Sequence, residues 1–288
     1  MIAALGRRFL AASFIAFASN AAAQSWGWDD GTVPYVQTPA EIVERMMRMA
    51  EVGQGDHLID LGSGDGRIVI AAAKRGATGL GVDLDPSLVK LATENAVREG
   101  VAERARFEVR DIFETDLSRA TVVAFYLLPE FNAKLMPKLL ALKPGTRIVS
   151  HDGSIGDWPP DERLEMRTPE KPVGVGGFSR VELFIVPANA RGSWISEVPA
   201  HGGTWRFAVK QKYQQLDLDV VAQGRDLLVR NSRLRGTEIK IVVTGIVGTH
   251  AWHHLFEGRI DGDRIAGTLT ISDGNNQRTF PWTATRTR

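Results

Sequence analysis

The chain has 288 residues, and at about 150 residues per domain this length predicts two domains. Its 35 basic and 34 acidic side chains give a net charge of +1. Because proteins that bind nucleic acids are typically strongly basic, we expect no nucleic-acid partner. With 43% hydrophobic and 24% charged residues, the composition is typical of a globular protein. The chain has no cysteine, so disulfides, thiolate catalysis and cysteine-ligated metal centres are excluded.

The first 23 residues have the pattern of a secretory signal peptide. Arg7 and Arg8 precede the apolar stretch from Phe9 to Ala18, and Ala21 to Ala23 provide the small residues of a cleavage site. This stretch is shorter than the about 20 apolar residues of a membrane-spanning helix. The pattern predicts export to a bacterial periplasm, with no transmembrane segment in the mature chain. An uncleaved anchor, an organelle presequence and a cytoplasmic protein with an unused signal stay open as alternatives.

Residues 24–187 are expected to form one domain, in which strand-like runs alternate with amphipathic helical ones. We expect strands at 57–61, 79–84, 105–109, 121–128, 146–150 and 179–186, and helices at 38–49, 68–74, 86–99 and 130–142. Thr38 is expected to cap the first helix, with Pro39 in its first turn and Glu41 closing a capping box. Strands alternating with helices predict a parallel sheet covered on both faces.

Residues 188–288 are expected to form a second, all-β domain. Apolar and polar residues alternate with a period of two, which is typical of half-buried strands. The alternating apolar residues are Trp205, Phe207 and Val209, then Leu216, Leu218 and Val220, then Ile239, Ile241 and Val243, and then Phe280, Trp282 and Ala284. Asp261-Gly262 lies between two such runs and predicts a two-residue hairpin. The pattern indicates seven or eight short antiparallel strands in a small barrel or sandwich.

Two polar features of the second domain invite a functional interpretation. The histidines His250, His253 and His254 are close in sequence, but alternation along a strand sets His253 apart from the other two. No acidic pair nearby completes a ligand shell, so we expect solvated or capping histidines and no metal site. The arginine-rich residues 225–235 are expected to form a solvated sheet face, and an acidic partner is the alternative.

The most informative segment is a glycine-rich turn, Asp60 to Arg67 (DLGSGDGR), between a predicted strand and a predicted helix. Glycines in such a turn allow close backbone approach to a ligand. Asp83 ends the next strand about 20 residues later, where a carboxylate accepts ribose hydroxyls, and Asp111-Ile112 ends the third strand, where side chains border an adenine. The pattern predicts a nucleoside-binding crevice. A turn without a ligand is the alternative.

The spacing of the turn argues against a pyrophosphate ligand. The third glycine of a dinucleotide fingerprint comes one place early, at Gly66, and Arg67 takes its expected position. Asp60 would repel a pyrophosphate but suits a cationic ligand such as S-adenosylmethionine, which has a sulfonium and an ammonium.

These residues resemble the motifs of the class I methyltransferases that use S-adenosylmethionine. The matching stretches are Asp60 to Gly66, Gly81 to Asp83 and Asp111, within a resemblance that covers about residues 30–187. It implies a Rossmann-like sheet of seven strands with a reversed last strand, followed here by the small all-β domain. Val33 to Pro39 (VPYVQTP) and Asp60 to Ile70 are also similar to the ATP synthase c-subunit lysine methyltransferase family and its bacterial relatives, and more loosely to Dot1-type enzymes.

The resemblance implies a set of cofactor-binding residues. Tyr35 and Thr38 would cover the cofactor, and Asp60, Gly62, Ser63 and Gly64 would pack on its methionine part. Asp83 would hold its ribose, and Asp111 and Ile112 would border its adenine.

Residues for the methyl acceptor are less strongly indicated. Tyr126 and Glu130 follow the fourth strand, where class I enzymes place acceptor-binding residues, and a strand end with Pro129 starting a helix is the alternative. His151 before Asp152 could act as a base or have a structural role. We assign no catalytic residue, because methyl transfer depends mainly on holding nucleophile and methyl at attack distance.

The leading hypothesis is therefore an S-adenosylmethionine-dependent methyltransferase that acts on a nucleophile such as a protein lysine. An exported, non-catalytic nucleoside-binding protein with a β docking domain is the alternative, and an oxidoreductase is a third. Residues 24–187 have 25 acidic and 19 basic side chains, whereas residues 188–288 have 9 acidic and 14 basic ones. A cationic lysine would be attracted to the first domain and an acidic partner to the second.

Overall fold

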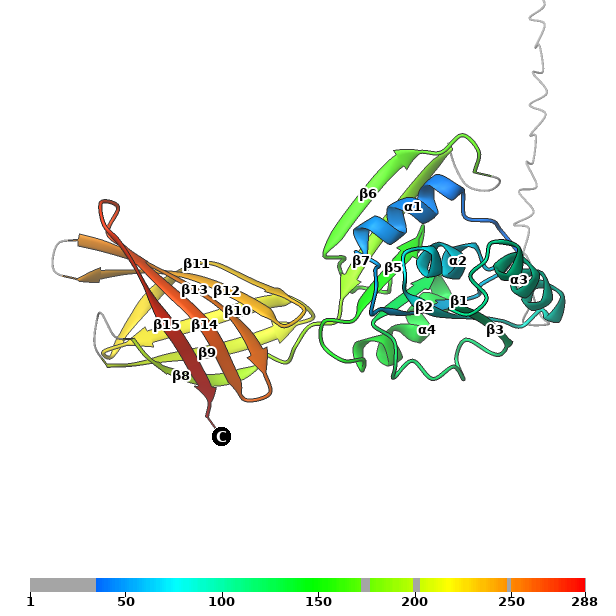
Figure 1. The fold of residues 1–288 in the computed structure, drawn as a ribbon. Coiled ribbons are helices and arrows are strands. Elements are labelled where there is room, and N and C mark those ends of the chain that lie inside the picture. The colour runs from blue at the N-terminus through cyan, green and yellow to red at the C-terminus, as the bar shows by residue number, and fades with distance from the viewer. Residues whose placement is uncertain (1–34, 172–176, 199–202, 248–249, 288) are drawn as a thin grey trace, which may run out of the picture. The chain divides into compact units, whose positions relative to one another are not determined.

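The structure, a computed structural model, describes residues 35–171, 177–198, 203–247 and 250–287 (Figure 1). The predicted signal peptide, residues 1–23, lies outside the described residues, as do Val33 and Pro34. Within the described ranges the chain forms four α-helices and fifteen β-strands. None of the helices in these ranges has the length and apolar character needed to cross a membrane.

The first part of the described chain is a seven-stranded sheet flanked by the helices. The helices are α1 (Ala40–Met49), α2 (Arg67–Lys74), α3 (Pro86–Arg98) and α4 (Pro129–Leu140). The strands are β1 (His57–Leu61), β2 (Thr78–Asp83), β3 (Ala105–Val109), β4 (Val122–Phe125), β5 (Arg147–His151), β6 (Glu162–Arg167) and β7 (Phe178–Ile185). Their order is β3-β2-β1-β4-β5-β7-β6, and β7 runs antiparallel to both of its neighbours. The predicted seven-strand sheet with a reversed last strand is confirmed.

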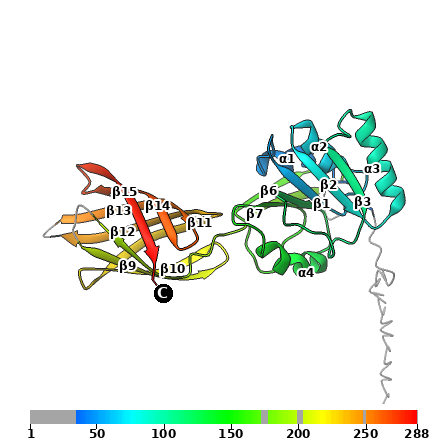
Figure 2. The same cartoon turned by 60° about the horizontal axis from the view of Figure 1, so that its bottom comes forward.

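The sheet is covered on both faces, as Figure 2 shows with α4 on the opposite side from α1, α2 and α3. Alternation along β1 accounts for the two layers, because Leu58 packs with residues of α1 and α2 whereas Ile59 and Leu61 pack with residues of α4. Parallel strands buried on both faces are nearly continuous apolar runs, which is why the sequence identified them.

The start of α1 differs from the prediction. The helix begins at Ala40 after Pro39, and in the described residues no side chain caps it, so the capping box with Thr38 was wrong. Thr38 is buried, and its Oγ1 lies 3.3 Å from Nδ1 of His151. A contact 113 residues away in sequence therefore replaces the local capping bond.

Two strand predictions also change. The sequence pattern does not indicate β6, because this edge strand has mostly exposed and half-buried residues and four charged side chains in six positions. The strand expected at 121–128 ends at Phe125, and the next three residues lead into α4, which has Pro129 in its first turn.

The remaining described strands form a closed barrel, so the barrel rather than the sandwich is confirmed. They are β8 (Gly192–Glu197), β9 (Thr204–Lys212), β10 (Gln215–Ala222), β11 (Arg225–Arg235), β12 (Glu238–Val247), β13 (His250–Asp261), β14 (Arg264–Ser272) and β15 (Gln277–Arg286). The barrel closes where Thr285 and Arg286 of β15 pair with Ile195 and Trp194 of β8. Asp261 pairs with Arg264, so the hairpin turn is Gly262-Asp263, one residue later than expected.

Side chains fill the barrel, as the diameter of an eight-stranded barrel allows. Its core includes the buried aromatic residues Trp194, Trp205, Phe207, Phe256 and Trp282. His254 is part of this interior, with its ring centroid 4.7 Å from that of Trp205, so its expected solvation was wrong. His253, one position earlier, lies 3.0 Å from the Thr244 hydroxyl. Residues 225–235 form β11, in which the arginine side chains are exposed or half-buried.

Candidate functional site

The predicted site residues lie in one row at the carboxyl edge of the sheet. Leu61 pairs with Val82 on one side and with Phe125 on the other, and Phe125 pairs with Ser150. The residues that directly follow these four paired positions therefore lie side by side along the edge of the sheet. In order across the edge they are Asp83, Gly62, Tyr126 and His151. Neighbouring strands are about 4.8 Å apart, so these four positions span roughly 15 Å. This edge is where open α/β sheets bind ligands.

Asp83 connects the glycine turn to the end of β2. Its Oδ2 accepts a hydrogen bond of 2.9 Å from the Gly64 amide, and its Oδ1 accepts one of 3.1 Å from the Asp85 amide. The Gly62 and Ser63 amides both donate to the Val82 carbonyl at 2.9 Å. The turn is thus fixed to β2 by its own backbone, with a half-buried carboxylate at its rim.

The segment before α1 lies over the glycine turn. A Cβ added to Gly64 would overlap the Tyr35 ring, so this ring packs directly on the turn. Arg67 donates a hydrogen bond of 2.8 Å to the Thr38 carbonyl, and its guanidinium forms an ion pair of 2.5 Å with Asp65. The turn thereby holds Tyr35 and Thr38 above the row of strand ends, where the resemblance placed a cofactor-covering segment.

Asp60 is a buried carboxyl group whose two oxygens have no hydrogen-bond partner in the described part of the chain. Burial raises its pKa well above the usual value, and the nearby carboxylates of Asp83 and Asp65 add to this rise. The buried Ser63 hydroxyl in the turn is likewise unpaired among the described residues. Unmade hydrogen bonds are unfavourable, so this carboxyl group fits a ligand with a cationic donor, such as the ammonium of S-adenosylmethionine.

Asp111 and Ile112 lie after β3, at the end of the row beyond Asp83. One Asp111 carboxylate oxygen accepts a hydrogen bond of 2.8 Å from the Phe113 amide, and the Asp111 carbonyl accepts one of the same length from the Thr115 hydroxyl. Both residues are half-buried, so the carboxylate and an apolar side chain lie together at the surface of the crevice.

Tyr126 and His151 meet at the other end of the row. Their ring centroids are 4.1 Å apart. Burial raises the pKa of Tyr126 to about 12, with the Asp152 carboxylate contributing, so the phenol keeps its proton at neutral pH. His151 is fully buried, and burial lowers its pKa to about 4 against the opposing effect of Asp152. Its two nitrogens lie 3.3 Å and 3.0 Å from the hydroxyls of Thr38 and Ser179. These contacts favour a structural, uncharged His151 over a base.

The second acceptor candidate, Glu130, is exposed in the first turn of α4. Within the described residues no hydrogen bond or ion pair links its side chain to Tyr126 or His151. The structure instead brings Asp152 and Lys171 to the Tyr126 end of the row. The sequence did not indicate Lys171, because it lies beyond β6, which was itself missed.

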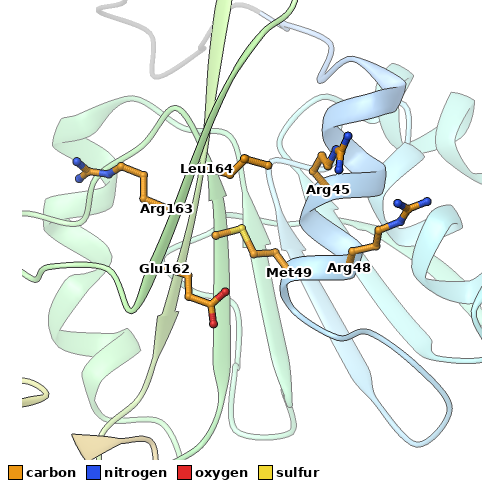
Figure 3. Close-up of a pocket in the computed structure, with 6 residues that line it drawn as sticks. All are labelled: Arg45, Arg48, Met49, Glu162, Arg163 and Leu164. Carbon is orange, nitrogen blue, oxygen red and sulfur yellow. The ribbon is translucent and has the colours of Figure 1, made fainter. Parts of the chain in front are cut away.

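A separate surface hollow lies between α1 and β6 (Figure 3). It is lined by Arg45, Arg48, Met49, Glu162, Arg163 and Leu164. Figure 3 shows Met49 and Leu164 between the two elements, with Arg45 and Arg48 on the helix side. None of the predicted cofactor residues lines this hollow, so it is distinct from the row of strand ends.

Comparisons with known proteins find matches to part of this chain. A family model described as "ANTKMT methyltransferase domain" matches residues 60–162. The chain is 44% identical over 137 residues to a protein-lysine N-methyltransferase of Saccharolobus islandicus (strain REY15A), a match that covers 46% of this chain and 85% of that protein. It is 35% identical over 130 residues to the lysine N-methyltransferase of the ATP synthase c-subunit from Homo sapiens, covering 45% of this chain and 55% of that enzyme.

A solved structure also matches, that of an RNA methyltransferase from Salinibacter ruber in complex with S-adenosyl-L-homocysteine. The identity is 44% and the TM-score 0.47, with coverage of 57% of this chain and 97% of that one. The chain thus spans most of the archaeal relative but little more than half of the human enzyme's length.

Proposed function

The chain belongs to the class I S-adenosylmethionine-dependent methyltransferase family, and from that membership we propose that its acceptor is the side-chain amine of a protein lysine. The identity of 44% to an archaeal protein-lysine methyltransferase is the observation that carries this proposal. The acidic balance of residues 24–187 supports it, because a cationic lysine is attracted to an acidic domain.

Each part of the cofactor has a matching group in the row of strand ends. Asp60 suits the cofactor's ammonium, and Asp83 at the rim of the turn suits the ribose hydroxyls. Asp111 and Ile112 would border the adenine, and Tyr35 and Thr38 would cover the bound cofactor. When bound, S-adenosylmethionine supplies an electrophilic methyl group on a sulfonium.

The protein's own contribution is to position the acceptor and exclude water. A lysine becomes nucleophilic only after losing its proton, and transfer to a desolvated pocket favours the neutral amine. Tyr126, whose phenol keeps its proton, would line the place of the acceptor, and the ring of the uncharged His151 packs against it with 4.1 Å between the ring centroids. Orientation at attack distance then accounts for most of the acceleration.

Labelled-methyl transfer tests the proposal. The mature protein is incubated with S-adenosylmethionine carrying an isotopic methyl label and a cell extract, and the labelled species are identified by mass spectrometry. We expect label on protein lysine. Label confined to nucleic acid or to small molecules would contradict the lysine acceptor.

Replacing Asp83 by alanine is the matched test of the cofactor site. We expect affinity for S-adenosylmethionine to fall at least about 30-fold in isothermal titration, because charged hydrogen bonds are worth about 1.5–3 kcal/mol each. Asp217→Ala is the control, since Asp217 is an exposed residue of the barrel strand β10. Unchanged affinity in Asp83→Ala would remove Asp83 from the cofactor site.

We also propose that residues 1–23 direct export to the periplasm. The charged start, the apolar stretch and the alanine-rich end support this localisation. Cell fractionation with intact-mass measurement should find a periplasmic protein that starts at Gln24. A cytoplasmic protein that retains residues 1–23 would contradict export.

A further inference from the structure

We propose that Asp152, the Phe178 carbonyl and Tyr126 form the binding site for the acceptor's ammonium, and that Lys171 occupies this site when no acceptor is bound. The identity of the acceptor as a lysine rests on the proposed function. The ammonium-binding site itself rests on the contacts of these four residues.

Lys171 occupies the site like a bound substrate. Its Nζ forms an ion pair with the Asp152 carboxylate and donates a hydrogen bond of 2.7 Å to the Phe178 carbonyl. Its side chain is only 7% exposed, although lysine normally keeps its charged end in water. A carboxylate and a carbonyl around a sheltered ammonium are the contacts that an incoming lysine requires.

Asp152 is held in place by several elements at once. Its backbone is left-handed, with φ of 52°, which is uncommon for a residue other than glycine. Its Oδ1 accepts a hydrogen bond of 2.8 Å from the Arg180 amide, and its Oδ2 lies 3.4 Å from Nε2 of His151. The Tyr126 hydroxyl lies near this carboxylate, which contributes to the raised pKa of Tyr126. Because the surroundings fix the carboxylate, it is available to a cation without rearrangement.

The site lies at the acceptor end of the row. Tyr126 is the first residue after β4, and Asp152 follows His151 at the end of β5. The Leu127 side chain approaches the Gly62 position, where an added Cβ would lie 3.1 Å from its Cδ2. The groups of the ammonium site follow β4, β5 and β7, so one to three strand spacings, roughly 5–15 Å, separate them from the glycine turn. An amine held here lies on the same edge of the sheet as the proposed methyl donor.

Lys171 is suited to be a displaceable occupant. It comes from the connection between β6 and β7 rather than from a strand, and its amide donates only to the nearby Thr168 carbonyl. An acceptor lysine can take over the contacts with Asp152 and Phe178 while the sheet stays intact. Competition by Lys171 then lowers the affinity for an acceptor amine.

Amine binding to the full mature protein tests this inference. The probe is Nα-acetyl-L-lysine amide, compared with the uncharged Nα-acetyl-L-norleucine amide, and both are titrated by NMR into the wild type and Lys171→Met. Methionine keeps the apolar part of the side chain but has no ammonium. We expect the amine to bind Lys171→Met at least about tenfold more tightly than the wild type, and the norleucine compound to bind neither. Equal binding of the amine to both proteins would overturn the proposal.

Two further variants separate the site from a structural ion pair. Adding Asp152→Asn to Lys171→Met should abolish the gain in amine affinity. Asparagine is the replacement because it tolerates the left-handed backbone at this position. Lys90→Met is the matched control, because Lys90 is 79% exposed on α3 and should behave as the wild type. Melting curves confirm that each variant folds. Retained amine binding in the double variant would show that Asp152 is not the ammonium acceptor.

Incubation with S-adenosylmethionine then tests whether the amine lies beside the methyl donor. We expect Lys171→Met to add about 14 mass units to the bound amine faster than the wild type. The ammonium first releases a proton to solvent, and the free amine then attacks the methyl carbon, whose bond to sulfur breaks to leave S-adenosylhomocysteine. An amine that binds without gaining a methyl would place the site away from the donor. Failure of S-adenosylhomocysteine to bind the wild type would instead overturn the cofactor assignment and leave the amine-binding result standing.

Discussion

Replacing Asp60 by asparagine is expected to stabilise the cofactor-free protein and to weaken cofactor binding at the same time. The carboxyl group is 1% exposed, and its oxygens have no partner among the described residues. A buried polar group without a partner costs about 1–3 kcal/mol, more when it is charged. Asparagine has nearly the same shape but cannot ionise. We therefore expect the free energy of unfolding to rise by about 1–3 kcal/mol at alkaline pH, measured by urea denaturation.

The raised pKa of Asp60 determines how the stability of the cofactor-free protein changes with pH. Burial and the neighbouring carboxylates raise the pKa of Asp60 in the folded state, so between the unfolded and folded pKa values the folded state binds more protons. The stability contributed by Asp60 is therefore complete at acid pH and is lost as the pH rises through the folded pKa. In Asp60→Asn this loss should be absent. An unchanged slope of stability against pH would contradict the unpaired carboxyl group.

Cofactor binding should respond in the opposite direction. An ammonium favours the ionised form of Asp60, so affinity for S-adenosylhomocysteine should increase as the pH rises through the Asp60 pKa. We expect at least about a tenfold loss of affinity in Asp60→Asn and a flatter pH profile, measured by isothermal titration. Asp219→Asn, at an exposed position in β10, is the control. Equal affinity in Asp60→Asn and the wild type would remove Asp60 from the cofactor site.

The sequence was informative where local pattern determines structure. The buried runs of β1, β4 and β5 and the glycine turn are continuous in sequence, so periodicity and turn chemistry predict both the sheet and its ligand-binding edge. The order of strands then brings Asp83, Gly62 and Tyr126 together. An all-β second domain was predictable for the same reason, since apolar alternation runs through strands such as β9 and β10. This alternation did not distinguish a barrel from a sandwich.

The sequence was uninformative where distant contacts decide. Threonine is a residue type typical of helix N-caps, yet the Thr38 hydroxyl contacts His151 instead. In the sequence, His254 belongs to a cluster of polar residues, but the register of β13 places its side chain in the interior of the barrel. Lys171 and Asp152 are 19 positions apart and meet because β7, which follows Lys171 in the chain, runs back along β5. Such pairings depend on tertiary packing, which a single sequence does not encode in any local pattern.

Replacing Gly64 by alanine is expected to have a large effect on cofactor binding. Gly64 has a φ of 52°, and a side chain in this left-handed conformation costs about 1–2 kcal/mol. The added Cβ would also overlap the Tyr35 ring and displace the segment that covers the turn. We expect affinity for S-adenosylhomocysteine to fall at least about 100-fold, or about 2.8 kcal/mol at about 1.4 kcal/mol per tenfold, as measured by isothermal titration.

A matched glycine and a double-mutant cycle separate the two causes. Gly100 has a φ of 70° and no atom within 4 Å of an added Cβ, so Gly100→Ala should show the backbone cost alone and leave cofactor affinity unchanged. Tyr35→Ala removes the overlapping ring. In the double variant of Gly64 and Tyr35 we expect the loss of stability to be smaller than the sum of the single losses by about 0.5–3 kcal/mol. If the losses simply add, or if Gly64→Ala behaves like Gly100→Ala, then Tyr35 does not pack on the glycine turn and the segment before α1 does not cover the cofactor.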